Sequence, residues 1–204
     1  MKFGASRSRQ GGHRLTRLDS ERRGRVTLGI INGYDKHKMR EPHRRAIARA
    51  GAVAAAFEAN LALFGFPLPE EVRTPAQLAA WSRQKTTIGQ GAAYFVELAE
   101  RGRVAIFEAA ERGFPPQLGT PILTTSKPRP QLALDLSAIA LRVNTGESLL
   151  LVFGLGPHGP PEPVRRACAA DFDVTEIGYS LETATALGAV ASAVWHATKR
   201  ARPR

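Results

Sequence analysis

The chain has 204 residues, of which 43% are apolar and 23% are charged, and its formal net charge is +11 at pH 7. That length and apolar content suit one sizeable core rather than two large domains. A single cysteine, Cys168, excludes an intrachain disulfide framework and a cysteine-rich zinc site, and it favours a reducing, cytoplasmic compartment. No apolar run reaches the roughly 20 residues that cross a bilayer, so we expect no membrane segment.

Most of the positive charge lies at the two ends. Residues 1–25 hold eight Lys or Arg against two acids, residues 199–204 hold four Lys or Arg, and residues 26–198 hold 17 basic and 16 acidic residues. We therefore predict a flexible basic tail over 1–25, one folded domain over 26–198 and a second basic tail over 199–204. Such tails suit attraction to the phosphate backbone of nucleic acid, although a solubilising role explains the same composition.

The folded part begins with a pattern of strand, helix and strand. Residues 25–32 (RVTLGIIN) are typical of a buried strand, and residues 41–59 have helical spacing with Pro42 in the first turn. Residues 61–66 (LALFGF) predict a second strand. Such a β-α-β unit implies parallel strands with a right-handed crossover.

The alternation continues to the end of the chain. The further predicted elements are a helix from Pro75 capped by Thr74, a helix at 91–100, a strand or short helix within 103–119, strands at 121–126 and 148–154, a helix at 162–170, a strand at 172–178 and a helix at 180–199. This order predicts a three-layer α/β domain with a mostly parallel sheet.

Ligands of parallel sheets bind beyond the carboxyl ends of the strands, which draws attention to the loop GLGPHGPP at 154–161. Its glycines let backbone groups approach a ligand, and its prolines fix its shape. It lacks the Lys and Ser/Thr of a phosphate-binding loop and the GxGxxG spacing, which disfavours ATP and NAD. A purely structural loop remains an equal alternative, and His158 within it is either a loop-shaping donor or a substrate contact.

A basic cluster follows the first strand, between residues 32 and 51. A solvated helix face explains such a charge run, but its place at the end of a strand suits a negatively charged substrate. The candidate substrate-binding residues are Lys36, His37, Lys38, Arg40, His43 and Arg44.

The last part of the chain resembles the SPOUT, or trefoil-knot, methyltransferases. In their ribose-methylating branch one motif usually runs SLNVSVA, and residues 180–186 read SLETATA, which matches Ser180, Leu181 and Ala186 and has Glu182 in place of Asn. TTSKP, GLGPHG and IGYSL correspond in order to the three cofactor loops of that family. The resemblance covers residues 26–198, is strongest from about residue 120, and is nearest to an archaeal branch.

The resemblance implies a carboxyl-terminal trefoil knot, a homodimer, and S-adenosylmethionine held mainly by backbone groups, without a metal. The cofactor-binding residues would be Thr124, Thr125, Phe153, Gly154, Leu155, Gly156, Gly159, Ile177, Gly178, Ser180, Leu181 and Ala186. The substrate would be RNA, either tRNA or rRNA. The small-residue face of the last helix suits a close dimer interface.

The resemblance also suggests which residues would act on the substrate. In the ribose-methylating relatives a similar stretch to residues 46–51 (AIARAG) carries an arginine, which makes Arg49 the first catalytic candidate. The spacing downstream departs from that of the family, so Arg45 or Arg44 is an alternative. A ribose hydroxyl needs a cation or base, whereas a base nitrogen needs an acid such as Asp35 or Glu182. A non-catalytic RNA-binding α/β protein is one competing hypothesis, and an unrelated small-molecule enzyme that uses the same crevice at the strand ends is another.

Overall fold

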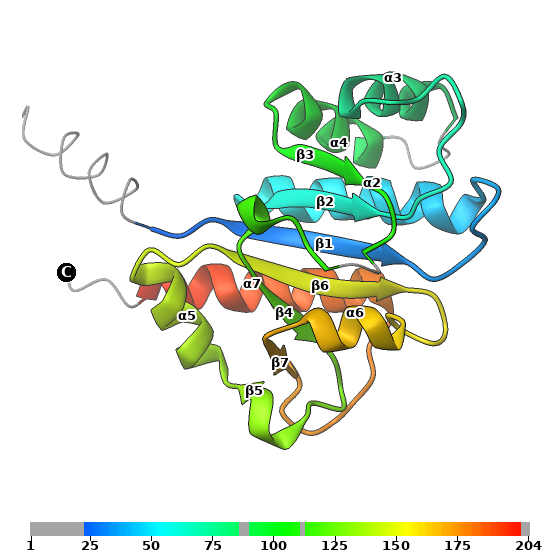
Figure 1. Ribbon diagram of the computed structural model, residues 1–204. Coiled ribbons are helices and arrows are strands. Elements are labelled where there is room, and N and C mark those ends of the chain that lie inside the picture. Colours follow the sequence, from blue (N-terminus) through cyan, green and yellow to red (C-terminus); the bar gives the residue numbers. More distant parts are fainter. Residues whose placement is uncertain (1–22, 86–89, 111–112, 201–204) are drawn as a thin grey trace, which may run out of the picture.

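The computed structural model describes residues 23–85, 90–110 and 113–200. Their strands form one seven-stranded sheet in the order β3-β2-β1-β6-β4-β7-β5, and every pairing is parallel (Figure 1). The strands are β1 (Val26–Asn32), β2 (Asn60–Phe64), β3 (Val104–Phe107), β4 (Thr120–Thr124), β5 (Ala133–Leu134), β6 (Leu149–Leu155) and β7 (Ala170–Phe172). The predicted α/β class with a parallel sheet is confirmed.

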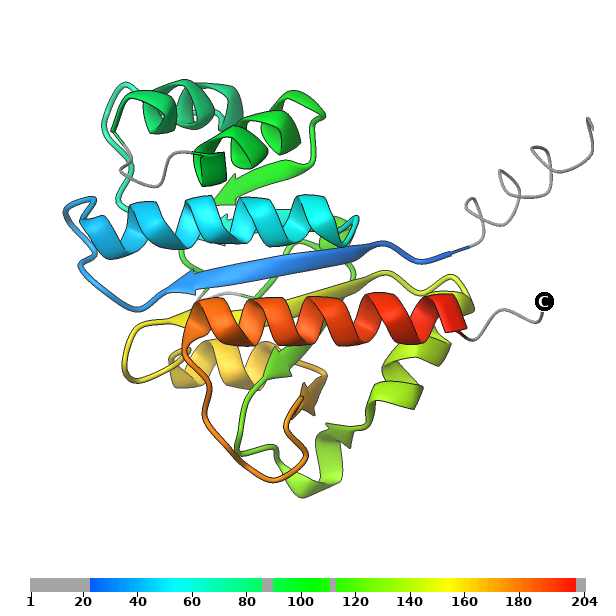
Figure 2. The ribbon, with the colours of Figure 1, turned by 180° about the vertical axis from the view of Figure 1, so that it is seen from behind.

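Helices cover both faces of this sheet. They are α2 (Glu41–Ala56), α3 (Pro75–Lys85), α4 (Gln90–Glu100), α5 (Leu136–Asn144), α6 (Glu162–Ala167) and α7 (Thr183–Arg200), with 3-10 turns η2 (Pro116–Leu118) and η3 (Pro130–Leu132). Figure 2 shows α2 and α7 side by side across one face, and α6 covers the other face (Figure 1). The predicted three layers are therefore present.

The central strand β6 shows how the sequence produces these layers. Its alternate side chains Leu149, Leu151 and Phe153 enter the core beneath α2, α4 and α7, whereas Leu150 and Val152 enter a smaller core beneath α6. All five are at most 2% exposed. A continuous apolar run is required here because both faces of the strand are covered.

Two local predictions need correction, and one helix was not predicted. The last strand was predicted at 172–178, but β7 covers Ala170–Phe172 and a loop follows. The last helix begins at Thr183 rather than at residue 180. Helix α5 was not predicted, although Asp135 caps it by accepting a hydrogen bond from the Ala138 backbone nitrogen at 2.7 Å.

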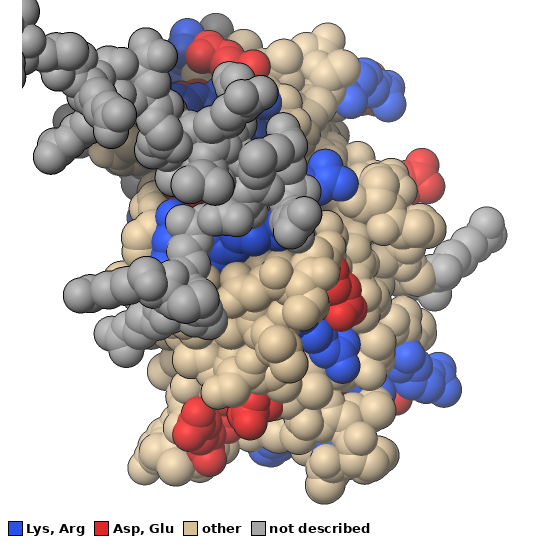
Figure 3. All heavy atoms as spheres, turned by 90° about the vertical axis from the view of Figure 1, so that its left-hand side faces the viewer, with Lys and Arg blue, Asp and Glu red and all other residues tan. Residues whose placement is uncertain are grey.

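The described chain begins and ends at the same end of the sheet, where the strands begin (Figure 1). Arg25 donates its backbone N–H to Ser148 Oγ at 3.1 Å, and Lys199 lies within α7, 3.5 Å from Glu58. The fold therefore extends slightly into both predicted tails, of which residues 1–22 and 201–204 lie outside the described part. Basic and acidic side chains are interspersed on this end of the molecule (Figure 3). Among the described helices, none is both long and apolar enough to span a membrane.

Candidate functional site

A cavity of about 1080 Å³ lies at the carboxyl ends of four adjacent strands, β1, β6, β4 and β7. The strand register brings these ends together, because Asn32 pairs with Leu155 and Thr124 pairs with Phe172. This is the edge of a parallel sheet where ligands bind. The cavity therefore lies at the strand ends where the sequence predicted a ligand site.

Ten of the twelve predicted cofactor-binding residues line the cavity. They are Thr124, Thr125, Phe153, Gly154, Leu155, Gly156, Gly159, Ser180, Leu181 and Ala186. The other two, Ile177 and Gly178, do not line it, and Ile177 is 73% exposed. Three loops that are far apart in the sequence therefore meet at one cavity.

The glycines of the β6–α6 loop have a steric reason as well as a place in the wall. A Cβ on Gly154 would lie 2.6 Å from Pro160 Cδ, because the loop folds back over the end of β6. Gly156 has a φ of +132°, and a Cβ there would lie 2.9 Å from the Gly33 carbonyl oxygen. Side chains at these positions would displace the loop. The structural and ligand-binding interpretations of this loop are therefore compatible.

The start of α7 is fixed against the same loop. Thr183 donates its hydroxyl hydrogen to the Gly154 carbonyl oxygen at 2.8 Å. Glu182 accepts hydrogen bonds from the Ala184 and Thr185 backbone nitrogens at 3.0 and 3.3 Å. Glu182, rather than Ser180, therefore caps the helix, and its carboxylate is engaged in doing so.

Asp173 shapes the loop between β7 and α7. Its carboxylate accepts hydrogen bonds from the Thr175 backbone nitrogen and hydroxyl and from the Gly178 backbone nitrogen, at 2.7–2.9 Å. Burial would raise the pKa of Asp173, but these hydrogen bonds outweigh it and lower the pKa. An ionised Asp173 therefore holds the loop as a turn, which explains why the predicted strand does not continue.

Four cationic side chains line the cavity. Arg45 and Arg49 come from α2, Lys127 from the loop after β4, and Arg165 from α6. Arg45 is paired with Glu41 at 3.0 Å, whereas Arg49 is exposed and has no ion pair within the described residues. The cavity can therefore receive a negatively charged ligand near Arg49.

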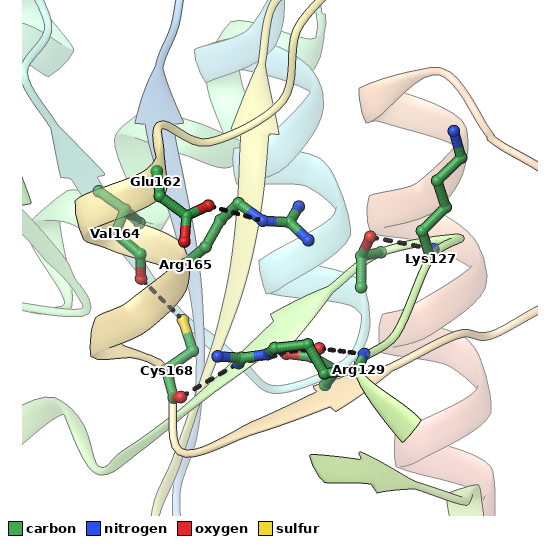
Figure 4. Close-up of polar contacts among 8 residues, drawn as sticks. Lys127, Arg129, Glu162, Val164, Arg165 and Cys168 are labelled. Atoms are coloured by element: carbon green, nitrogen blue, oxygen red, sulfur yellow. Dashed lines mark hydrogen bonds and ion pairs between the residues drawn. The ribbon is translucent and has the colours of Figure 1, made fainter. Parts of the chain in front are cut away.

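A buried ion pair lies beside Lys127 and α6, in which Arg165 pairs with Glu162 at 3.6 Å (Figure 4). Arg129 donates from its backbone nitrogen, Nε and Nη2 to the carboxylate of the fully buried Asp171, at 2.7–2.9 Å. Arg129 Nη2 also contacts the Cys168 carbonyl oxygen at 3.3 Å. These bonds fix the loop that carries Lys127 against β7 and the end of α6.

Asp35 and most of the predicted substrate cluster lie outside the cavity. Lys36, His37, Lys38 and Arg40 are exposed in the loop before α2 and do not line it. Hydrogen bonds from the His37 backbone and from Arg40 lower the pKa of Asp35 to about 2. Because such a weak base accepts a proton poorly, and because it stabilises its own loop, Asp35 is not retained as a catalytic base.

His43 has an internal role that the sequence did not reveal. It is fully buried, and its Nδ1 accepts the Arg40 backbone N–H at 3.0 Å while its Nε2 lies 3.0 Å from Asn32 Oδ1. Asn32 Nδ2 donates to the Gly65 carbonyl oxygen at 2.9 Å, so Asn32 Oδ1 accepts and His43 is neutral with its proton on Nε2. The prediction that His43 contacts substrate is therefore wrong. Arg44 also does not line the cavity and pairs with Glu41 at 2.8 Å.

Within the described residues, no group of three or more His, Cys, Asp or Glu side chains is arranged to hold a metal ion. Cys168 is 3% exposed, and burial raises the pKa of its thiol to about 12. The expected small buried cysteine is confirmed.

The sequence comparisons decide the family. Residues 26–195 match the family described as "Protein of unknown function (DUF531)". The chain belongs to this family. The uncharacterized protein MJ0224 of the archaeon Methanocaldococcus jannaschii is 37% identical over 178 residues, which cover 86% of this chain and 96% of that protein.

Solved structures show the fold class of this DUF531 member. A probable methyltransferase from Bordetella pertussis Tohama I has a TM-score of 0.60 at 17% identity and covers 86% of this chain and 96% of its own. TrmJ from Z. mobilis ZM4 has a TM-score of 0.53 at 14% identity, with coverage of 89% and 71%. The SpoU methyltransferase AviRb from Streptomyces viridochromogenes, solved with AdoMet, has a TM-score of 0.50 at 14% identity, with coverage of 93% and 63%. The DUF531 chain therefore has the SPOUT-type fold that its motifs suggested.

Several side chains in the wall of the DUF531 cavity were not predicted from the sequence, among them Lys127, Arg165 and Tyr34. Lys127 lies within the predicted TTSKP loop, so its position was available as a signal. Arg165 was placed on a helix, but only the fold shows that this helix faces the cavity. Tyr34 lies next to the basic cluster, but an uncharged side chain does not contribute to a charge pattern.

Proposed function

We propose that this protein transfers a methyl group from S-adenosylmethionine to RNA, either tRNA or rRNA. The observation that carries the proposal is the cavity of about 1080 Å³ in which TTSKP, GLGPHG and the segment before α7 meet on a SPOUT-type sheet. The solved structures with a similar fold include a putative RNA methyltransferase from Bacillus anthracis and AviRb in complex with AdoMet, which supports the same chemistry here. A trefoil knot and a homodimer are part of the proposal.

The residues of the cavity fit an adenosyl group. Apolar side chains of Leu187 and Val190 form part of the wall, and Ala184 and Ala186 leave space beside them. Backbone groups of the glycine loop can contact the polar atoms of the ligand, because no side chains intervene. When bound, S-adenosylmethionine supplies a methyl group on an already activated sulfonium.

Ribose 2'-O methylation is the form that the cavity supports best. A base nitrogen would need a free carboxylate, but Asp35 lies outside the cavity. The three carboxylates of the described chain that line the cavity are all engaged: Glu41 with Arg44 and Arg45, Asp173 within its own loop, and Glu182 at the start of α7. Arg49 is exposed at the cavity without an ion pair in the described part, whereas Arg45 is bound by Glu41. The Arg49 guanidinium can stabilise the negative charge that develops on a hydroxyl as its proton leaves.

Calorimetry of the purified chain with S-adenosylmethionine tests the cofactor assignment. We expect saturable heat, and a rise of about 2.7 kcal/mol in the free energy of unfolding at a ligand concentration of 100 times Kd. Absence of both would refute the enzyme, and RNA binding without cofactor binding would favour the non-catalytic alternative. Labelled methyl transfer to total RNA, followed by nucleoside analysis, then identifies the modified position.

The role of Arg49 is tested in the same transfer assay. We expect Arg49→Ala to lower the rate about 100-fold or more while the affinity for S-adenosylmethionine stays unchanged. Arg101→Ala is a matched control, because Arg101 is an exposed arginine outside the cavity. Full activity in Arg49→Ala would move the role to Arg45.

A further inference from the structure

Six large hydrophobic side chains of the described residues are exposed: Tyr34, Tyr94, Leu141, Ile177, Tyr179 and Leu181. Four of them lie at or beside the cavity, whereas Tyr94 on α4 and Leu141 on α5 lie elsewhere. Tyr34, Tyr179 and Leu181 line the cavity, and Ile177 belongs to the same β7–α7 loop. Exposed apolar side chains that cluster rather than scatter indicate a binding surface.

Tyr34 is held rigidly at this surface. Its backbone nitrogen donates to Asn32 Oδ1 at 3.0 Å. Its ring meets the His43 ring edge-on at 6.1 Å between centroids, and His43 meets the Phe66 ring at 5.7 Å. Tyr34 is therefore the outermost of three rings that lead into the core, and it is still 43% exposed.

Tyr179 is also presented by a fixed loop. Its backbone nitrogen donates to Thr175 Oγ1 at 3.1 Å, and the Thr175 hydroxyl is bound in turn by Asp173 at 2.7 Å. The ring is nevertheless 69% exposed. A loop fixed by its own hydrogen bonds, with its aromatic ring outward, is arranged for a contact outside the folded chain.

The charges around the tyrosines indicate what that contact is. Arg49, Lys127 and Arg165 line the same cavity, so flat aromatic rings and cations face one space. A nucleotide matches both, because its base stacks on aromatic rings and its phosphate is attracted by the cations. The cavity, at about 1080 Å³, is slightly larger than the roughly 300–1,000 Å³ usual for one drug-sized ligand, which leaves space beside a cofactor.

We propose that Tyr34 and Tyr179 form an aromatic rim that stacks the base of an unpaired nucleotide at the cavity. This inference rests on the proposed methyl-transfer function and specifies its substrate as RNA whose target nucleotide lies in a single-stranded region. A base inside a duplex presents only its edges, so it cannot stack on the rim without leaving the helix. Neither tyrosine is a catalytic residue; both position the nucleotide.

The test uses the full chain and a single-stranded RNA nonamer with 2-aminopurine at its centre, because stacking quenches the fluorescence of that base. We expect the wild-type protein to quench it and to bind the corresponding duplex more weakly. Tyr34→Ala and Tyr179→Ala should each weaken binding of the nonamer roughly 5- to 150-fold and reduce the quenching. Tyr34→Phe should behave as wild type, since it keeps the ring.

Tyr94→Ala is the matched control, because Tyr94 is 46% exposed on α4 and does not line the cavity. In the transfer assay, the rim variants should raise KM for RNA and leave the calorimetric affinity for S-adenosylmethionine unchanged. The inference fails if the rim variants bind the nonamer as wild type does, or if the duplex binds equally well. It also fails if the variants change the sedimentation coefficient without changing RNA affinity, since the face would then join two copies of the chain.

Because the nonamer is measured without cofactor and the cofactor without RNA, the two proposals fail separately. Cofactor binding without quenching refutes the aromatic rim alone. Quenching without cofactor binding supports the rim and refutes methyl transfer.

Discussion

Replacing Asp171 by asparagine should destabilise the protein strongly, because it removes one charge of a buried ion pair. The Asp171 side chain is 0% exposed and is 2.7 Å from Arg129 Nη2, whose side chain is 27% exposed. Asparagine keeps the size but loses the charge and turns one acceptor into a donor, which leaves the guanidinium poorly compensated. Breaking such a pair costs about 3 kcal/mol.

Thermal unfolding measures this loss. A domain of this size loses about 2–4 °C of melting temperature per kcal/mol, so we expect a drop of roughly 6–12 °C. The matched control is Glu97→Gln, which breaks an equally short ion pair, 2.6 Å from Arg101, with side chains 49% and 64% exposed. That control should lose at most about 1 kcal/mol.

Two results would refute the reasoning. One is a loss below about 1 kcal/mol in Asp171→Asn, which would mean that solvent compensates Arg129 fully. The other is an equal loss in Glu97→Gln, which would mean that burial does not decide the cost. The pH dependence of stability gives an independent check. Burial raises the pKa of Asp171, but the hydrogen bonds from Arg129 lower it by more than burial raises it, so the net shift is downward. The stabilisation is therefore present above the ordinary value of 3.8 and is lost as the pH falls through the folded-state pKa.

Three further predictions follow from the site. Burial lowers the pKa of His43 below its usual 6.5, so near and below that pH the unfolded chain binds the proton more readily than the folded chain. The melting temperature should therefore fall as the pH is lowered from about 7 to about 5.5. The fall should be smaller in His43→Gln. Gly154→Ala should weaken S-adenosylmethionine binding about tenfold and lower the free energy of unfolding by about 1–3 kcal/mol, because the new Cβ would lie 2.6 Å from Pro160 Cδ. Gly188→Ala is the control, because a Cβ there meets nothing within 4 Å and should change neither the affinity nor the stability. Deletion of residues 1–22, which removes six basic and two acidic residues, should lower RNA affinity and its salt dependence while calorimetry shows unchanged cofactor affinity, since the described chain begins at the end of the sheet away from the cavity.

Regular elements with strong periodicity were predictable from the sequence. The run at 148–154 is the central strand β6, which is buried along nearly its whole length, and the helix expected at 41–59 is α2, whose buried residues recur at helical spacing. The strand predicted at 172–178 was wrong because local hydrogen bonds from the Asp173 side chain compete with strand pairing. Asp173 stands one residue after the observed strand, where an aspartate is a turn signal that outweighs the apolar residues after it.

The candidate site was predictable where it depends on main chain and unpredictable where it depends on distant side chains. Gly154 and Gly156 stand out because few residues other than glycine tolerate such close approach, so their loop could be found from the letters alone. The position of Tyr34 depends instead on Asn32, whose amide reaches the Gly65 carbonyl oxygen 33 residues away. No local sequence pattern predicts the contact between Asn32 and Gly65. Without that contact, Asn32 Oδ1 would not be held in place as the acceptor for the Tyr34 backbone nitrogen. The tertiary fold therefore determines which side chains face a substrate at this cavity, even though the glycines alone predict where the cavity is.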